Sequence, residues 1–309
     1  MIIRPAKIPA GGTIGVVGPG GPVKIERLNA GVAYLEKRGY RVILGKHVRD
    51  ARGYLAGKDV DRAEDINRMM RSPEIDALFC SRGGYGSPRL LDLLDFEAFA
   101  TNPKVFVGYS DITALQLALF KRTGLISFSG PMVGVEMGLG IAEFTEKHFW
   151  SVVTTSTDSG KLTSLDGSLQ CLADGVAEGR LIGGNLSMLC SLIGTPYLPD
   201  LAGAILIIED IAENPYRIDR KLMQLRLAGL LQKVSGLILG QFTDCNSDSE
   251  GEDLNLEELV TGVTSDLNIP IVTGFPFGHE ENKYTIPLGV RARLNAAEGF
   301  LEFLEPATA

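Results

Sequence analysis

Histidine is scarce in this chain of 309 residues, and the chain lacks both clustered basic residues and long apolar runs. The net charge is −8, which argues against a nucleic-acid partner because phosphate contacts need clustered Lys and Arg. No apolar run approaches the roughly 18–20 residues that a membrane helix needs, and residues 1–10 lack the apolar core of a signal peptide. We therefore expect a cytoplasmic protein that binds neither nucleic acid nor membrane.

The cysteines show no pattern of a disulfide framework or metal site. Cys80, Cys171, Cys190 and Cys245 stand far apart, with no C-x-x-C pair. Cys80 and Cys190 lie in apolar runs, where cysteine usually behaves as a small buried hydrophobe. We expect structural thiols, no metal and no cofactor.

Short, continuous apolar runs alternate with segments of helical spacing through the first half of the chain. Such runs are typical of strands buried on both faces of a parallel sheet. They occur at 14–17, 40–44, 77–80 and 105–107, and further strands are expected at 203–208, 236–240, 271–272, 291–294 and 300–304. Predicted helices include 25–38, 61–71, 87–94 and 220–231.

Between 158 and 175 the composition changes to Ser, Thr, Gly and Asp, which is typical of a linker or an irregular crossover. The sequence therefore predicts an α/β protein of two domains. An N-terminal parallel-sheet domain with flanking helices would span 1–160, a linker 161–175, and a smaller C-terminal α/β domain 176–309.

The chain has three histidines, and histidine is the commonest general base near neutral pH. His148 has charged neighbours in a helix-like segment and is expected to be a solvated surface residue. His47 follows a strand and is expected to be structural. His279 lies in a turn punctuated by Gly and Pro after a strand, where α/β proteins place functional side chains.

Ser110 lies where a predicted strand runs through Gly108-Tyr109-Ser110-Asp111 into a helix. This is typical of a nucleophile elbow, in which a sharp turn exposes the hydroxyl and the next backbone N–H can stabilise an oxyanion. The match to G-x-S-x-G is incomplete because Asp111-Ile112 replaces the final x-Gly. The alternative is that the Ser110 hydroxyl caps the helix.

Glu209 ends the apolar run 205–208, where its carboxylate could orient an imidazole or pair with Arg217 or Arg220. The segment Ser81–Gly86 follows another predicted strand, and its three glycines would let the backbone approach a ligand closely. A phosphate-binding loop is disfavoured because the chain has no G-x-x-x-x-G-K-[ST] string.

Taken in order along the chain, these motifs and several later ones resemble the L,D-carboxypeptidase family of serine peptidases. The resemblance runs from about Gly12 to Leu294. It rests on the strings RGGYG (82–86), GYSD (108–111), GPM (130–132), GGNL (183–186), LIIED (206–210), YRIDR (216–220), GQF (240–242) and GFPFGH (274–279).

The resemblance implies a catalytic triad contributed by both domains, with the active site in the cleft between them. Ser110 would be the nucleophile, Glu209 the orienting acid and His279 the base. The amides of Gly84 and Asp111 would form the oxyanion hole.

Two further residues are implied as substrate contacts. Asn185 matches a position associated with substrate contact in the family. Arg82 is a candidate for binding the terminal carboxylate of the substrate, although an arginine beside a glycine-rich turn more often supports the loop.

The implied reaction is hydrolysis of an L,D amide bond that releases terminal D-alanine from cytoplasmic muropeptide tetrapeptides during cell-wall recycling. We also expect a homodimer. One alternative is the microcin-immunity branch of the family, which cleaves an aminoacyl-nucleotide antibiotic; the compact chain favours the muropeptide enzyme. A non-catalytic module that binds a small ligand is the other alternative, and the presence of all three triad residues argues against it.

Overall fold

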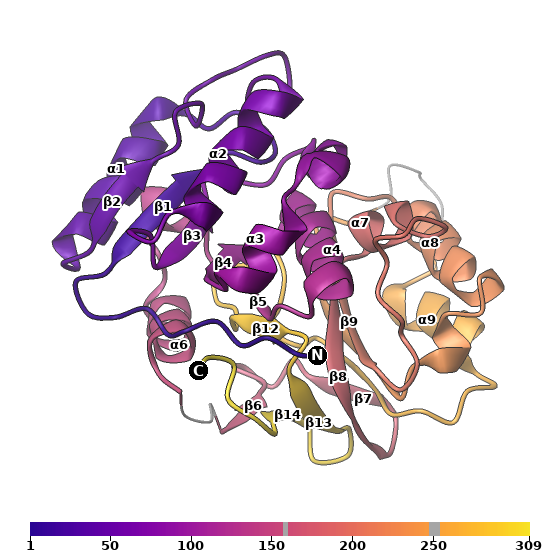
Figure 1. Ribbon diagram of the computed structural model, residues 1–309. Helices are drawn as coiled ribbons and strands as arrows, with labels where there is room; N and C mark the ends of the chain where they lie inside the picture. The colour runs from indigo at the N-terminus through magenta and orange to yellow at the C-terminus, as the bar shows by residue number, and fades with distance from the viewer. Residues whose placement is uncertain (157–159, 247–253) are drawn as a thin grey trace. The chain divides into compact units, whose positions relative to one another are not determined.

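The computed structural model describes residues 1–156, 160–246 and 254–309, and the chain forms two compact units (Figure 1). The first unit comprises Met1–Thr157, Tyr284–Gly289 and Pro306–Ala309, and the second comprises Asp158–Lys283 and Val290–Glu305. No helix among the described residues is long and apolar enough to cross a membrane.

The first unit is built on a six-stranded sheet in the order β12-β5-β4-β3-β1-β2, parallel except for β12. Its strands are β1 (Thr13–Val17), β2 (Arg41–Leu44), β3 (Ala77–Cys80), β4 (Val105–Gly108), β5 (Ser127–Ser129) and β12 (Ile286–Leu288). β2 and β3 lie on opposite sides of β1, so the direction in which the chain adds strands to the sheet reverses after β2. Ligands of such sheets bind at the carboxyl ends of the strands that flank this reversal.

Helices lie between the strands of the first unit, as the sequence predicts. They are α1 (Ile25–Lys37), α2 (Asp59–Arg71), α3 (Phe96–Thr101), α4 (Thr113–Thr123), α5 (Glu136–Leu139) and α6 (Glu143–Thr154), with 3-10 turns η1 (Ser87–Leu93) and η2 (Ser110–Ile112). The core includes the fully buried rings of Phe79, Phe106, Phe128 and Phe149. Both termini belong to this unit, and the Ala309 amide donates to the Pro5 carbonyl at 2.8 Å.

The second unit contains a mixed eight-stranded sheet in the order β6-β14-β13-β8-β9-β10-β11-β7. Its parallel centre is β8 (Val176–Asn185), β9 (Ile205–Ile211), β10 (Gly236–Thr243) and β11 (Ile271–Thr273). Antiparallel strands flank it: β6 (Lys161–Thr163), β7 (Gln170–Ala173), β13 (Arg291–Asn295) and β14 (Phe300–Phe303). The helices are α7 (Leu186–Ser191), α8 (Pro215–Leu227) and α9 (Leu256–Thr264), with the 3-10 turn η3 (Leu231–Lys233).

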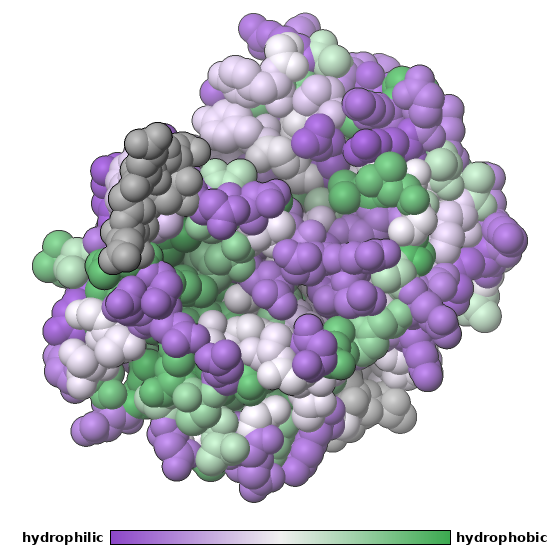
Figure 2. All heavy atoms as spheres, turned by 180° about the vertical axis from the view of Figure 1, so that it is seen from behind, coloured by the Kyte–Doolittle hydropathy of each residue, from purple (hydrophilic) through white to green (hydrophobic). Residues whose placement is uncertain are grey.

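The predicted α/β class is confirmed, while the structure differs from the predicted boundaries in two ways. The stretch predicted as a linker, 161–175, contains the strands β6 and β7 of the second unit. The chain also returns to the first unit at Tyr284–Gly289 and Pro306–Ala309. All four cysteines are free, with Cys80 and Cys190 buried as expected. Figure 2 shows hydrophilic residues spread over the face that it draws, with apolar residues between them.

Candidate active site

Ser110 is the first residue of η2 and has a strained backbone, two residues after the end of β4 at the carboxyl end of the parallel sheet. Its φ is +63°, in the left-handed region that costs an ordinary residue roughly 1–2 kcal/mol. The strained elbow backbone predicted from the sequence is therefore present. The capping alternative is not observed, because the cap residues of η2 and α4 are Tyr109 and Ile112 and neither helix start has a side-chain cap.

The glycine-rich loop after β3 runs directly against Ser110. A Cβ placed on Gly83 would lie 2.9 Å from the Ser110 Cβ and 3.1 Å from its Oγ. The Gly83 carbonyl accepts a hydrogen bond from the Gly21 amide at 2.8 Å, which ties this loop to the turn after β1. Glycine is required at position 83 because any side chain would displace the Ser110 hydroxyl.

The amides predicted to form the oxyanion hole are those of Asp111 and of Gly84, the residue after Gly83 in this loop. In the ranges that the structure describes, neither amide donates a hydrogen bond within the protein. Arg82 supports the same loop, since its Nη1 donates to the Pro22 carbonyl at 3.0 Å. Its contact with a substrate carboxylate stays a prediction.

Glu209 and His279 form a hydrogen-bonded pair within the second unit. Glu209 lies in β9 and its side chain is 2% exposed, and its Oε2 is 2.7 Å from His279 Nδ1. The sequence left two kinds of partner open for Glu209, an imidazole or one of two arginines. In the structure Glu209 bonds the imidazole of His279. Arg217, one of the alternative partners, lies 3.8 Å from Glu213.

The loop that carries His279 is held to β10 by backbone hydrogen bonds. The Gln241 amide donates to the Phe277 carbonyl at 2.7 Å, and the Phe275 amide donates to the Leu239 carbonyl at 3.1 Å. Gly278 has φ +136°, and a Cβ there would lie 3.2 Å from Glu209 Oε2. The loop thus presents the imidazole to the carboxylate with no side chain between them. That Ser110 of the first unit meets this pair remains a prediction.

Asn185 ends β8 and pairs in register with Glu209 of β9. It is 5% exposed, and its side-chain amide donates to Asp210 Oδ1 at 2.9 Å. Its own oxygen accepts from the Met188 amide at 3.2 Å, which caps α7. Asn185 therefore lies beside Glu209, and its side chain caps α7. Its contact with substrate stays a prediction.

His148 is not the solvated surface residue that its charged neighbours suggested. Its ring packs against those of Phe144 and Tyr284, and its Nδ1 accepts a hydrogen bond from the Thr285 amide at 3.0 Å. Burial lowers the pKa of His148 to about 4. The expectation was wrong because Tyr284 and Thr285, from far along the chain, return to contact this imidazole.

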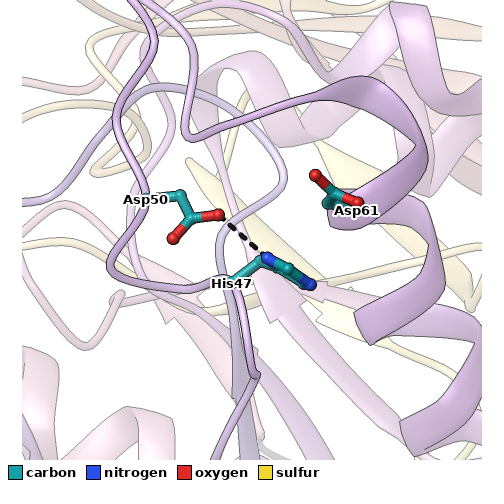
Figure 3. Close-up of side chains that lie close together, drawn as sticks. All are labelled: His47, Asp50 and Asp61. Atoms are coloured by element: carbon teal, nitrogen blue, oxygen red, sulfur yellow. Dashed lines mark hydrogen bonds and ion pairs between the residues drawn. The ribbon is translucent and has the colours of Figure 1, made fainter.

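His47 forms a small polar cluster with Asp50 and Asp61 (Figure 3). Its Nδ1 is 2.9 Å from Asp50 Oδ2, and its backbone amide donates to Asp65 at 2.7 Å. The three side chains offer ligand atoms within 4.8 Å of one another. These bonds support the structural role expected for His47, and exposed carboxylates near an imidazole do not by themselves make a metal site.

The sequence analysis missed Arg62, whose side chain is fully buried beside the glycine-rich loop and donates to the Gly86 carbonyl. A signal was present in the sequence. Arg62 precedes Ile66 and Met69 by about one and two turns of α2, and both of those residues are buried. A charged residue on the apolar stripe of a helix is a buried charge that needs an explanation.

Comparison with known proteins places this chain in a described family. The family model of the LD-carboxypeptidase N-terminal domain matches residues 14–130, and that of the C-terminal domain matches residues 178–294. A probable murein peptide carboxypeptidase of Bacillus subtilis is 37% identical over 295 residues, which is 96% of this chain and 92% of that protein.

Two solved folds are similar over nearly the whole chain. The crystal structure of muramoyltetrapeptide carboxypeptidase from Oxalobacter formigenes has a TM-score of 0.82 at 38% identity, over 94% of this chain and 97% of that one. The microcin C7 self-immunity protein MccF of Escherichia coli is 30% identical over 94% of this chain and 92% of that protein. The structure of MccF with glutamyl sulfamoyl guanosine has a TM-score of 0.91 at 28% identity over 99% of both chains.

Proposed function

We propose that this chain, which belongs to the LD-carboxypeptidase family of peptidases, is a serine peptidase that releases terminal D-alanine from muropeptide tetrapeptides. The observation that carries the proposal is the buried hydrogen bond of 2.7 Å between Glu209 and His279. An imidazole held by a buried carboxylate is the arrangement that activates a serine nucleophile. The strained turn at Ser110 and the glycine loop against it supply the other half of such a site.

In the proposed acylation step, the Glu209 carboxylate accepts a hydrogen bond from the Nδ1–H of His279, which leaves Nε2 as the basic nitrogen. Nε2 takes the Ser110 hydroxyl proton as Oγ attacks the carbonyl carbon of the scissile amide. The amides of Gly84 and Asp111 stabilise the resulting oxyanion. Each such donor is typically worth about 10²–10³ in rate.

In the remaining steps, His279 gives the proton that it took from Ser110 to the leaving amine and then activates a water molecule. The imidazolium of His279, stabilised by Glu209, gives its proton to the leaving amine, the C–N bond breaks, and D-alanine departs. His279 then deprotonates a water molecule, which attacks the ester carbon on Ser110. The bond between that carbon and Oγ breaks, His279 returns the proton to Oγ, and the shortened peptide leaves. These steps use the chain's own residues and need no metal or cofactor.

The substrate assignment rests on chain identity to murein peptide carboxypeptidases. Two of these relatives are 37% and 38% identical to the chain. Arg82 and Asn185 are the proposed contacts with substrate, Arg82 with the terminal carboxylate. We place the reaction in the cytoplasm as part of cell-wall recycling, carried out by a homodimer.

One observation favours a second candidate function. The TM-score with MccF bound to glutamyl sulfamoyl guanosine is 0.91, higher than the 0.82 with the muramoyltetrapeptide carboxypeptidase. In this second function the same triad would cleave an aminoacyl-nucleotide. The lower identity to MccF, 30% against 37%, leads us to prefer the muropeptide.

The test is a parallel incubation of the purified protein with two substrate classes, read by mass spectrometry. One class comprises tetrapeptides that end in D-alanine, with diaminopimelate or lysine at position three, and the other an aminoacyl-nucleotide. We expect loss of alanine from a tetrapeptide and none from the matched peptide that ends in L-alanine. Cleavage of the nucleotide conjugate alone would establish the second function. Binding of both without cleavage would show a binding module.

A further inference from the structure

Three loops of the first unit meet at the carboxylate of Asp111. Asp111 is 2% exposed, and its Oδ1 and Oδ2 accept the amides of Gly86 and Ser87 at 3.2 and 2.9 Å. The Ser87 hydroxyl donates to the Asp111 carbonyl. A Cβ on Gly20, in the turn after β1, would lie 2.8 Å from Oδ2. One side chain therefore connects the turns that follow β1, β3 and β4.

Arg62 of α2 holds the same loop from the other side of Gly86. Its side chain has no exposed surface, and its Nη1 donates to the Gly86 carbonyl at 3.1 Å and to the Pro19 carbonyl. Its Nη2 lies 2.5 Å from Asp59 Oδ1. Gly86 is thus fixed at both its N–H and its C=O, by two buried charged side chains from different elements.

Gly86 itself cannot be replaced without moving this arrangement. Its φ is +127°, and a Cβ there would lie 2.5 Å from Leu55 Cδ2 and 3.0 Å from Arg62 Nη1. The loop therefore has a fixed point at Gly86, two residues after the exposed Gly84 and three after Gly83, which touches Ser110.

Stability alone is a poor reason to bury these two charges. Burying a charge carries a desolvation cost, and replacing buried ion pairs by apolar side chains of similar volume is frequently neutral or stabilising. Burial raises the pKa of Asp111, and the amides of Ser87 and Gly86 and the charge of Arg62 act against that rise. The two charged side chains make four hydrogen bonds to the backbone. Asp111 accepts from the amides of Gly86 and Ser87, and Arg62 donates to the carbonyls of Gly86 and Pro19. Apolar side chains could not make these bonds.

We propose that the Asp111 carboxylate and the Arg62 guanidinium are positioning residues that fix the Gly83–Gly86 loop against Ser110. The inference rests on the proposed serine-peptidase function, in which the Gly84 amide must stay at a fixed place relative to the Ser110 Oγ. Catalytic groups need to be held within about 0.5 Å of their productive geometry, and a displacement of about 1 Å can cost roughly 10²-fold in rate.

Asp111→Asn tests the proposal without removing the Asp111 amide, which is the proposed oxyanion donor. Asparagine keeps the size but has one acceptor oxygen, so one of the two loop amides loses its partner. We expect kcat for D-alanine release to fall roughly 10- to 10²-fold, with KM changed less than about threefold. Hydrogen exchange at the Gly86 and Ser87 amides should become about 10-fold faster or more.

Asp65→Asn is the matched control, because Asp65 is also buried, at 3% exposure. It accepts two backbone amides of the turn after β2, from Lys46 and His47, at 2.9 and 2.7 Å. We expect Asp65→Asn to lower stability to a similar extent with kcat unchanged. Arg62→Lys, which keeps the charge, should lose less kcat than Arg62→Met, and this pair carries the test if Asp111→Asn does not fold.

Unchanged kcat and unchanged exchange at Gly86 and Ser87 in Asp111→Asn would overturn the proposal. An equal loss of kcat in Asp65→Asn would also overturn it, because the effect would then be general destabilisation. If the wild type releases no D-alanine, the proposed function fails, and faster exchange at Gly86 in Asp111→Asn would still establish that this carboxylate holds the loop.

Discussion

The imidazole of His148 should make the stability of the first unit depend on pH. Its Nδ1 accepts the Thr285 amide at 3.0 Å, and burial lowers its pKa from 6.5 to about 4. Between these pH values the unfolded chain binds a proton that the folded protein does not, so stability rises with pH over this window. The contribution is fully present above about pH 6.5 and is lost as the pH falls towards about 4.

The size of the effect follows from the lowering of the pKa. At about 1.4 kcal/mol for each pKa unit, the full loss is about 3 kcal/mol. About 2 kcal/mol of this falls between about pH 7 and about pH 5. His148→Gln should abolish this part of the pH dependence, because glutamine keeps an acceptor for the Thr285 amide and does not titrate.

Urea unfolding followed by the fluorescence of Trp150 is the appropriate assay. Trp150 is the chain's single tryptophan and lies in α6, two residues from His148, so its signal reports unfolding of the first unit. The wild type should lose about 2 kcal/mol more than His148→Gln on going from about pH 7 to about pH 5. Equal losses in the two proteins would refute the reasoning.

Three further predictions concern the site itself. Glu209→Gln should lower kcat by about 10²- to 10⁴-fold in steady-state D-alanine release, because the buried partner of His279 loses its charge; an unchanged kcat would remove Glu209 from the site. Gly83→Ala should lower kcat roughly 10- to 10²-fold, since its Cβ would lie 2.9 Å from the Ser110 Cβ, whereas Gly262→Ala, where a Cβ meets nothing within 4 Å, should have wild-type kcat. Dialysis against a chelator should leave D-alanine release unchanged, and a loss restored by one added metal would contradict a triad mechanism.

Sequence reasoning succeeded where a feature is local. The central strands of both sheets are continuous apolar runs, and the elbow at Ser110 is encoded by the strand and helix on either side of it. The Glu209–His279 pair was found from residue type and from position at strand ends, helped by the family resemblance. For the strands and the elbow, burial and backbone conformation follow from neighbouring residues. Glu209 and His279 are 70 positions apart, and the local signal was that each follows a predicted strand.

The features that were missed depend on segments distant in the chain. β6 and β7 are short edge strands of mixed polarity, so neither shows the apolar run of a buried strand. His148 is contacted by Tyr284 and Thr285, which lie more than a hundred positions later, and nothing near it in the sequence indicates this. The burial of Arg62 likewise arises from the loops after β1 and β3, which close over it.

The most direct test of the account is the rate of D-alanine release from a muropeptide tetrapeptide by Ser110→Ala, His279→Ala and the double variant. Ser110 belongs to one unit and His279 to the other, so only a shared step would couple the two substitutions. Members of a triad act as a unit, and their effects do not add. We predict that each single variant loses nearly all turnover and that the double variant is no slower than either. Wild-type turnover by Ser110→Ala, or losses that multiply in the double variant, would contradict the proposed triad.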